Sequence, residues 1–165
     1  MEIKLIGSSL NGVWSNPKIY INKQSQSIKS FSKYDQFAIE ILRKKNIPIA
    51  ILTIENDISI LKMAKILNIE NVYINEQEKL KRMKYLCKKM NINMDQVAYI
   101  GNDLNDLDIL NSVKISGAPV DSPIINYITP SIITKRIGGE GAFREFVDKI
   151  TDINPIDDFI NKILK

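Results

Sequence analysis

Short apolar runs alternate along the chain with longer segments in which apolar residues recur every three or four positions. The runs have the length of β-strands, and the longer segments have the period of amphipathic helices. Strands are predicted at residues 3–6, 49–53, 72–74, 97–100, 113–116 and, in a shorter form, 132–133. Helices are predicted at residues 34–45, 57–67, 76–90 and 103–110. This order predicts an α/β fold, with a central parallel sheet and helices on both faces.

The segment after the first strand has a different pattern. Residues 18–22 and 27–31 alternate between polar and apolar and flank a polar turn, which predicts a β-hairpin over residues 18–31. An isolated hairpin is marginal in water, so its Ile and Tyr side chains need a cover. Another subunit is one candidate cover, and the rim of a binding site is the other.

The far end of the chain predicts a further helix. Asn154 and Pro155 have the pattern of a helix cap followed by a first-turn proline, ahead of the sequence IDDFINKIL. A C-terminal tail and helices are therefore expected over residues 138–165. With 165 residues, 44% of them hydrophobic, the chain is long enough for one core, so residues 1–165 are expected to form a single domain.

Composition excludes several kinds of chemistry. The chain has no histidine, which removes Ser-His-Asp, Cys-His and His-metal arrangements together. Any reaction must use carboxylates, lysine, hydroxyls or backbone groups. The one cysteine, Cys87, lies in a lysine-rich helical pattern, so it forms no internal disulfide and is expected to serve packing.

Charge and hydropathy limit the kinds of binding partner and the compartment that we expect. The net charge of +4 comes from basic residues spread along helices, and aromatic residues, at 7%, form no stacking platform, so nucleic-acid binding is not expected. No apolar run reaches 18 residues, and the N-terminus lacks a secretory pattern. We therefore expect a cytoplasmic protein without a membrane span.

Polar residues follow the predicted strands at their carboxyl ends, where parallel α/β sheets bind ligands. Taken singly, each has a plain structural explanation: a strand terminus, a helix-face lysine, or an Asn/Asp turn that caps a helix. Together they form an ordered series of small polar, hydroxyl, lysine and acidic groups. The series is Ser9, Asn11, Thr53, Glu55, Lys79, Asn102, Asp103 and Asp106.

Five segments in this order give a family resemblance: NGVWSN, AILTIEN, VAYIGNDLND, SGAPVDS and GGEGAFREFVDKI. They resemble the capless sugar-acid phosphatases of the haloacid dehalogenase (HAD) superfamily, which act on 2-keto-3-deoxy-nononate 9-phosphate and 3-deoxy-manno-octulosonate 8-phosphate. The five segments also resemble the C-terminal domain of animal acylneuraminate cytidylyltransferases. The resemblance covers nearly the whole chain and implies a Rossmann-like HAD fold.

The resemblance implies roles for individual positions. In that family one aspartate attacks phosphorus and a second serves as acid and base; these positions are Ser9 and Asn11 here. Thr53 and Lys79 match the residues that hold phosphate oxygens. The family's Mg²⁺ site falls on Ser9, Asn11, Asn102, Asp103 and Asp106.

Three positions that hold carboxylates in the family are occupied by neutral residues in this chain, which leaves two acids and a lysine in the site. Mg²⁺ relies on carboxylates and substrate phosphate, so the site is expected to hold it poorly. Ser9 has no histidine to activate it, and Asn11 exchanges no proton near neutral pH. Ile54 stands where the family usually has glycine, and a branched side chain there is expected to crowd the phosphate pocket. These departures predict a weakly active or non-catalytic family member.

The resemblance further implies ligand contacts and assembly. Gly12, Glu55, Gly139 and Arg144 match substrate-binding positions for a phosphorylated sugar acid, with Gly139 and Arg144 in a tail that reaches toward a neighbouring subunit. Trp14 is expected to serve packing or a subunit contact. The family assembly is a homotetramer in which four hairpins meet. A second interpretation, from a different functional class, is a non-catalytic oligomeric scaffold or regulator whose partner is a sugar-acid cytidylyltransferase or another glycan enzyme.

Overall fold

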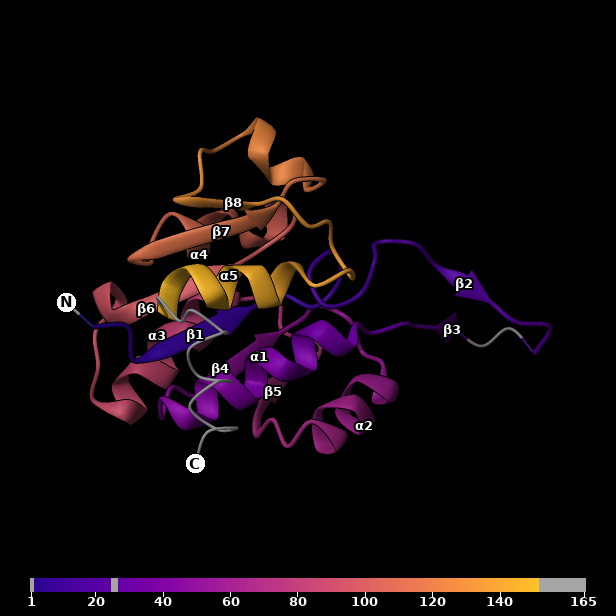
Figure 1. The fold of residues 1–165 in the computed structure, drawn as a ribbon, viewed down its shortest axis with the longest axis horizontal. Coiled ribbons are helices and arrows are strands. Elements are labelled where there is room, and N and C mark those ends of the chain that lie inside the picture. The colour runs from indigo at the N-terminus through magenta and orange to yellow at the C-terminus, as the bar shows by residue number, and fades with distance from the viewer. Residues whose placement is uncertain (1, 25–26, 152–165) are drawn as a thin grey trace, which may run out of the picture.

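The computed structural model describes residues 2–24 and 27–151, and the helix predicted near Asn154 lies outside them. A six-stranded sheet forms the centre of the molecule, and every strand pair in it is parallel. Its order is β5-β4-β1-β6-β7-β8 (Figure 1). The strands are β1 (Leu5–Ser8), β4 (Ile49–Leu52), β5 (Asn71–Tyr73), β6 (Val97–Ile100), β7 (Ile115–Pro119) and β8 (Ile132–Thr134). The predicted α/β fold is confirmed, with small shifts at strand ends.

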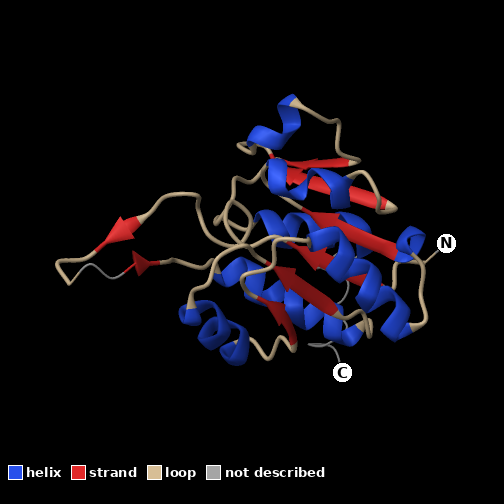
Figure 2. Ribbon diagram, turned by 180° about the vertical axis from the view of Figure 1, so that it is seen from behind, coloured by secondary structure: helices blue, strands red, loops and turns tan. Residues whose placement is uncertain are grey.

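Helices cover both faces of the sheet (Figure 2). Alternate side chains of a strand point to opposite faces, so Ile6 and Leu5 of β1 enter different clusters. The cluster around Ile6 includes side chains from α1 (Lys33–Lys44), α2 (Ile58–Ile66) and α5 (Ala142–Thr151). The cluster around Leu5 includes α3 (Lys79–Met90) and α4 (Leu107–Leu110). Cys87 is buried in this second cluster, as expected for a packing residue.

Capping side chains set the starts of two helices. Ser32 accepts a hydrogen bond from the Tyr34 N–H at the start of α1, and Asp57 accepts one from the Ser59 N–H at the start of α2. Left-handed asparagines then end three helices. They are Asn46, Asn68 and Asn91, with φ between 49° and 55°.

Two predicted helices begin differently in the structure. The helix predicted from residue 76 starts at Lys79, because the Glu76 carboxylate accepts from the Glu78 N–H and the Arg82 guanidinium instead of entering the helix. The segment predicted as a helix over 103–110 opens with a 3₁₀ turn, η2 (Leu104–Asp106), before α4. Two further 3₁₀ turns are η1 (Met94–Gln96) and η3 (Pro123–Asn126).

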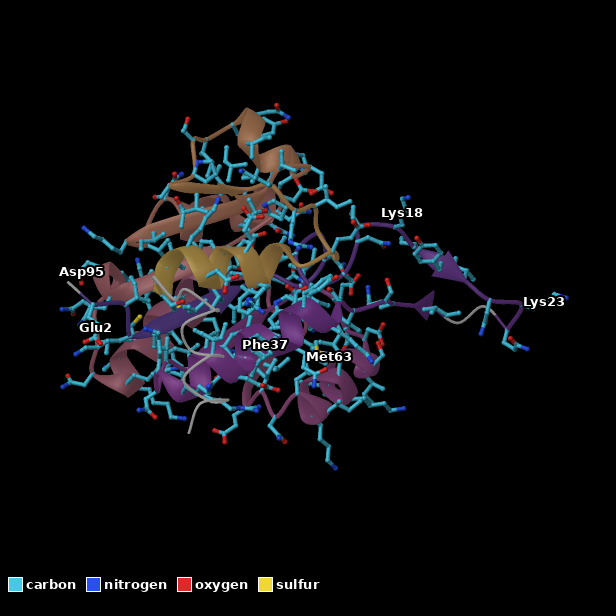
Figure 3. The ribbon with its side chains drawn as sticks, in the orientation of Figure 1. Glu2, Lys18, Lys23, Phe37, Met63 and Asp95 are labelled. Atoms are coloured by element: carbon cyan, nitrogen blue, oxygen red, sulfur yellow. The ribbon has the colours of Figure 1, made fainter. Side chains whose placement is uncertain are left out.

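The predicted hairpin is present and projects away from the body of the molecule (Figure 1). It consists of β2 (Tyr20–Ile21) and β3 (Ser27–Ile28), which pair antiparallel over a shorter length than predicted. Lys18 and Lys23 mark its extent in Figure 3. Three of its side chains lie largely in solvent: Ile19 at 79% exposed, Ile21 at 69% and Ile28 at 53%.

Within residues 2–24 and 27–151, none of the helices combines the length and the apolar character that a bilayer crossing requires.

Candidate functional site

One cavity of about 270 Å³ opens where β1, β4 and β6 end. Parallel strands bring their carboxyl ends to the same edge of the sheet, so residues from distant parts of the chain meet there. Every member of the predicted polar series lines this cavity. The lining residues are Ser9, Leu10, Asn11, Pro17, Thr53, Ile54, Glu55, Lys79, Asn102, Asp103, Asn105 and Asp106.

The loop after β1 is folded tightly on itself. Gly12 has φ of +72°, and a Cβ at this position would lie 2.2 Å from Cγ of Asn102. Only glycine therefore fits this turn against the loop after β6. The indole N–H of Trp14 donates to Oγ of Ser8 at 3.0 Å, and the Trp14 ring stacks on Phe143 with centroids 4.3 Å apart. Trp14 thus packs the loop onto the core and does not line the cavity.

A buried ion pair lies at the base of the cavity. Nζ of Lys79 is 2.7 Å from Oδ1 of Asp106, and these side chains are 4% and 1% exposed. Asp106 also accepts from the Tyr99 hydroxyl at 2.8 Å and from the Asn102 N–H at 2.9 Å. Burial, followed by the charge of Asp106, raises the pKa of Tyr99 well above its ordinary value, so the phenol acts as a neutral donor. Lys79 reaches Asn105 as well, at 3.2 Å.

At the positions where the family resemblance implies Mg²⁺ ligands, side-chain oxygens already accept hydrogen bonds from the chain itself. The Asp106 carboxylate already serves the donors just described. Both the carbonyl oxygen and Oδ1 of Asn102 accept from Oγ of Ser122, at 2.5 and 2.9 Å, and Asp103 accepts from the Leu104 N–H at 2.7 Å. In the described part of the chain, no three acidic, histidine or cysteine residues are grouped to hold a metal ion. Mg²⁺ needs oxygen ligands with spare charge, and this site offers few.

Two hydroxyl residues, Thr53 and Ser9, line another part of the cavity. Thr53 and Ser9 are each 3% exposed. Oγ1 of Thr53 accepts from the Glu55 N–H at 3.2 Å, which leaves the Thr53 hydroxyl proton free to donate to a ligand. Ile54 lines the cavity, but its side chain is 41% exposed, so the branched residue lies at the opening.

Two lining residues, Asn11 and Glu55, are contacted by a residue that the sequence analysis did not identify. Nδ2 of Asn11 donates to Oε1 of Glu55 at 2.5 Å. Lys29, just beyond β3 in the hairpin, places Nζ 3.0 Å from Oδ1 of Asn11 and 2.8 Å from Oε2 of Glu55. No strand-end or motif pattern marks Lys29, because it belongs to the hairpin.

Of the four predicted substrate-binding residues, Glu55 lines the cavity, whereas Gly12, Gly139 and Arg144 do not. The Gly139 N–H donates to the Val13 carbonyl at 2.9 Å, behind the loop after β1. Nε of Arg144 is 2.7 Å from Oδ1 of Asp148, and its guanidinium lies over the Phe37 ring. The predicted role of Gly139 and Arg144 at a neighbouring subunit's site stays a prediction.

Asp35 of α1 is a buried group that sequence reasoning also missed. It is fully buried, and its Oδ1 accepts from the Arg144 N–H at 2.8 Å, at the start of α5. Its other oxygen has no hydrogen-bond partner within the described residues. Burial raises the pKa of Asp35 to about 7, against the opposing effects of the Arg144 N–H and the Arg136 charge. Asp35 joins α1 to α5 and takes no part in the cavity.

Comparisons with known proteins first show the class of protein to which this chain belongs. Residues 68–119 match the family of haloacid dehalogenase-like hydrolases. The chain is 31% identical over 149 residues to the 3-deoxy-D-manno-octulosonate 8-phosphate phosphatase KdsC of Yersinia pestis, covering 90% of this chain and 80% of that protein. It therefore belongs to the haloacid dehalogenase-like family that contains these octulosonate phosphatases.

Two further matches extend the comparison. The crystal structure of the octulosonate 8-phosphate phosphatase of Moraxella catarrhalis, in complex with a magnesium ion, a phosphate ion and a KDO molecule, has a TM-score of 0.89 and 28% identity; the match covers 98% of this chain and 93% of that one. N-acylneuraminate cytidylyltransferase B of Danio rerio is 26% identical over 151 residues. That match covers 90% of this chain but only 36% of the cytidylyltransferase.

Proposed function

We propose that this chain binds a phosphorylated sugar acid and hydrolyses it weakly or not at all. One observation carries the proposal: the cavity retains Thr53 and Lys79 but has Ser9 and Asn11 where the family resemblance implies carboxylates. A general acid/base group contributes about 10²–10⁴-fold to a rate. Losses at residues that act together do not simply multiply, so a large but incomplete loss of activity is expected.

Two groups of lining residues suit the two parts of such a ligand. The Thr53 hydroxyl and the Lys79 ammonium are donors for a phosphate group. Asn11 and Glu55 offer an amide donor and a carboxylate acceptor, which suit the hydroxyl groups of a sugar. The named substrate of the Yersinia relative and the phosphate and KDO bound by the Moraxella relative support this ligand class.

The serine position is a poor nucleophile. Within the described residues, no side chain forms a hydrogen bond with the Ser9 hydroxyl. Lys79 is already held by Asp106 and Asn105, so it is not free to take a proton from Ser9. A hydroxyl needs an adjacent base to attack phosphorus, and the chain has no histidine to supply one.

The test measures binding and turnover separately. Calorimetry would measure the affinity for 3-deoxy-D-manno-octulosonate 8-phosphate, and a phosphate-release assay would follow the same ligand with and without Mg²⁺. We expect measurable binding with release near a no-protein control. Turnover comparable to that of an active octulosonate phosphatase would contradict the proposed lack of activity. The absence of any binding would contradict the proposed ligand.

A second candidate is a scaffold or regulator of a sugar-acid cytidylyltransferase. It is supported by the match to the Danio rerio enzyme and by the exposed apolar hairpin, which needs a cover. A homotetramer joined through the hairpins would provide that cover and would not require the catalytic carboxylates. Light scattering of the chain alone and mixed with a sugar-acid cytidylyltransferase tests this candidate, because a mixture that contains no joint species counts against it.

A further inference from the structure

Lys29 contacts residues of the cavity although β2 and β3 of its hairpin project away from the body of the molecule. The side chain of Lys29 is only 13% exposed, whereas Ile28 beside it is 53% exposed. Its ammonium contacts two side chains of the cavity wall, Asn11 and Glu55, which follow different strands of the sheet. Lys29 is therefore the contact through which the hairpin reaches the site.

Lys29 fixes the orientation of the Asn11 amide. Oδ1 of Asn11 accepts from Nζ of Lys29 at 3.0 Å and from Oγ of Ser15 at 3.1 Å, while Nδ2 donates to Glu55. A rotated amide would place its NH₂ group against the ammonium and its oxygen against the carboxylate. The lysine thus makes one amide orientation strongly preferred.

Lys29 also changes the charge of the cavity. Three carboxylates line it, from Glu55, Asp103 and Asp106, against the one ammonium of Lys79. The lining alone carries two more negative charges than positive ones, and Lys29 halves that excess. An anionic ligand enters such a site more readily when the carboxylate facing its sugar is already paired.

We propose that Lys29 is a positioning residue for the sugar-facing wall: it orients the Asn11 amide and offsets the Glu55 charge, so that the cavity accepts an anionic sugar and not merely phosphate. This inference rests on the proposed binding of a phosphorylated sugar acid. It assigns ligand selectivity to the hairpin, a part of the chain outside the strand-end series.

Binding of two probes separates this role from a general structural one. Calorimetry would compare inorganic phosphate with octulosonate 8-phosphate in the native chain, Lys29→Met and Lys29→Arg. We expect Lys29→Met to lower the affinity for octulosonate 8-phosphate by about tenfold or more, as for a lost charged hydrogen bond. The affinity for inorganic phosphate should fall by less than about threefold. Lys29→Arg should retain most of the affinity, and Lys18→Met, exposed on the same hairpin, is the matched control.

A ligand-free measurement decides the positioning role by itself. NMR would follow the side-chain amide of Asn11, assigned by its absence in Asn11→Asp, and we expect Lys29→Met to shift and mobilise it while Lys18→Met does not. An unchanged amide, or equal losses for both probes, would overturn the role of Lys29. If the native chain binds neither probe, the proposed function fails, and the amide measurement still decides the orientation.

Discussion

The ammonium of Lys79 lies 2.7 Å from the Asp106 carboxylate, and both side chains are almost completely buried. Removing one member of such a pair leaves an uncompensated charge in the interior. Lys79→Met should therefore destabilise the fold by about 3–5 kcal/mol, measured by urea unfolding. Adding Asp106→Asn should recover part of this loss, because it removes the stranded charge.

The control for this prediction is an exposed ion pair on the same helix. Lys81 pairs with Glu78 in solvent, so Lys81→Met should leave the unfolding midpoint unchanged. Equal effects of Lys79→Met and Lys81→Met would show that the buried pair stabilises the folded state no more than the exposed pair does.

Stability should depend on the ionisation of Asp35. Its folded pKa of about 7 lies above the ordinary value of 3.8, so between about pH 4 and 7 the folded chain holds a proton that the unfolded chain releases. The free energy of unfolding should thus fall as pH rises through this range, by at most about 4 kcal/mol, and level off above pH 7. Urea titrations at several pH values would measure it.

Asp35→Asn should flatten this pH dependence, because the neutral amide has no charge to desolvate but still accepts from the Arg144 N–H. Asp95→Asn, at an exposed site, is the matched control and should keep the native profile. A native chain whose stability rises steadily from pH 4 to 7 would contradict the shift at Asp35.

Restoring carboxylates should restore turnover if the cavity still recognises its ligand. Ser9→Asp, Asn11→Asp and Asn102→Asp together supply the groups that the family resemblance implies. We expect Mg²⁺-dependent phosphate release from octulosonate 8-phosphate to rise by about 10²-fold or more. Ser9→Asn is a neutral control of similar size. A folded, Mg²⁺-binding triple variant without activity would show that the pocket itself has diverged.

The hairpin should control assembly. The side chains of Ile19, Tyr20, Ile21 and Ile28 are all exposed, and so much apolar surface in water favours association. We expect a homotetramer by light scattering, weakened by Ile19→Asp or Tyr20→Asp and insensitive to Mg²⁺ chelation. Lys18→Glu, which adds charge without removing apolar surface, should leave it assembled. A native particle with the 18.8 kDa mass of one chain would contradict this prediction.

The sheet was predictable because its strands are short, apolar and separated by helical periods. The strand predicted at residues 97–100 has the same bounds as β6. Parallel strands bring their carboxyl ends together, so the order of elements also predicted which polar residues meet in the cavity. Helix starts were harder to predict, since the Glu76 carboxylate, by accepting from Glu78 and Arg82, delays α3 until Lys79.

Lys29 and Asp35 were not predictable from pattern alone. Lys29 lies in an alternating segment that places its side chain on the hairpin surface, and only the fold shows that Glu55 and Asn11 lie within its reach. Asp35 has the pattern of an exposed acid in the first turn of a helix. It becomes buried because α5, more than a hundred residues later, begins directly above it.

The loop after β1 is completed by glycines from the far end of the described chain. A Cβ at Gly138 would lie 2.2 Å from the carbonyl oxygen of Gly12, and one at Gly139 would lie 2.3 Å from the backbone nitrogen of Asn16. Contacts so distant along the chain form late, because their loop-closure entropy is lost before they stabilise anything. During synthesis, then, the loop should acquire its final form only after these glycines leave the ribosome. In pulsed hydrogen exchange during refolding, the backbone N–H of Trp14 should become protected at the same time as α5 and later than β1.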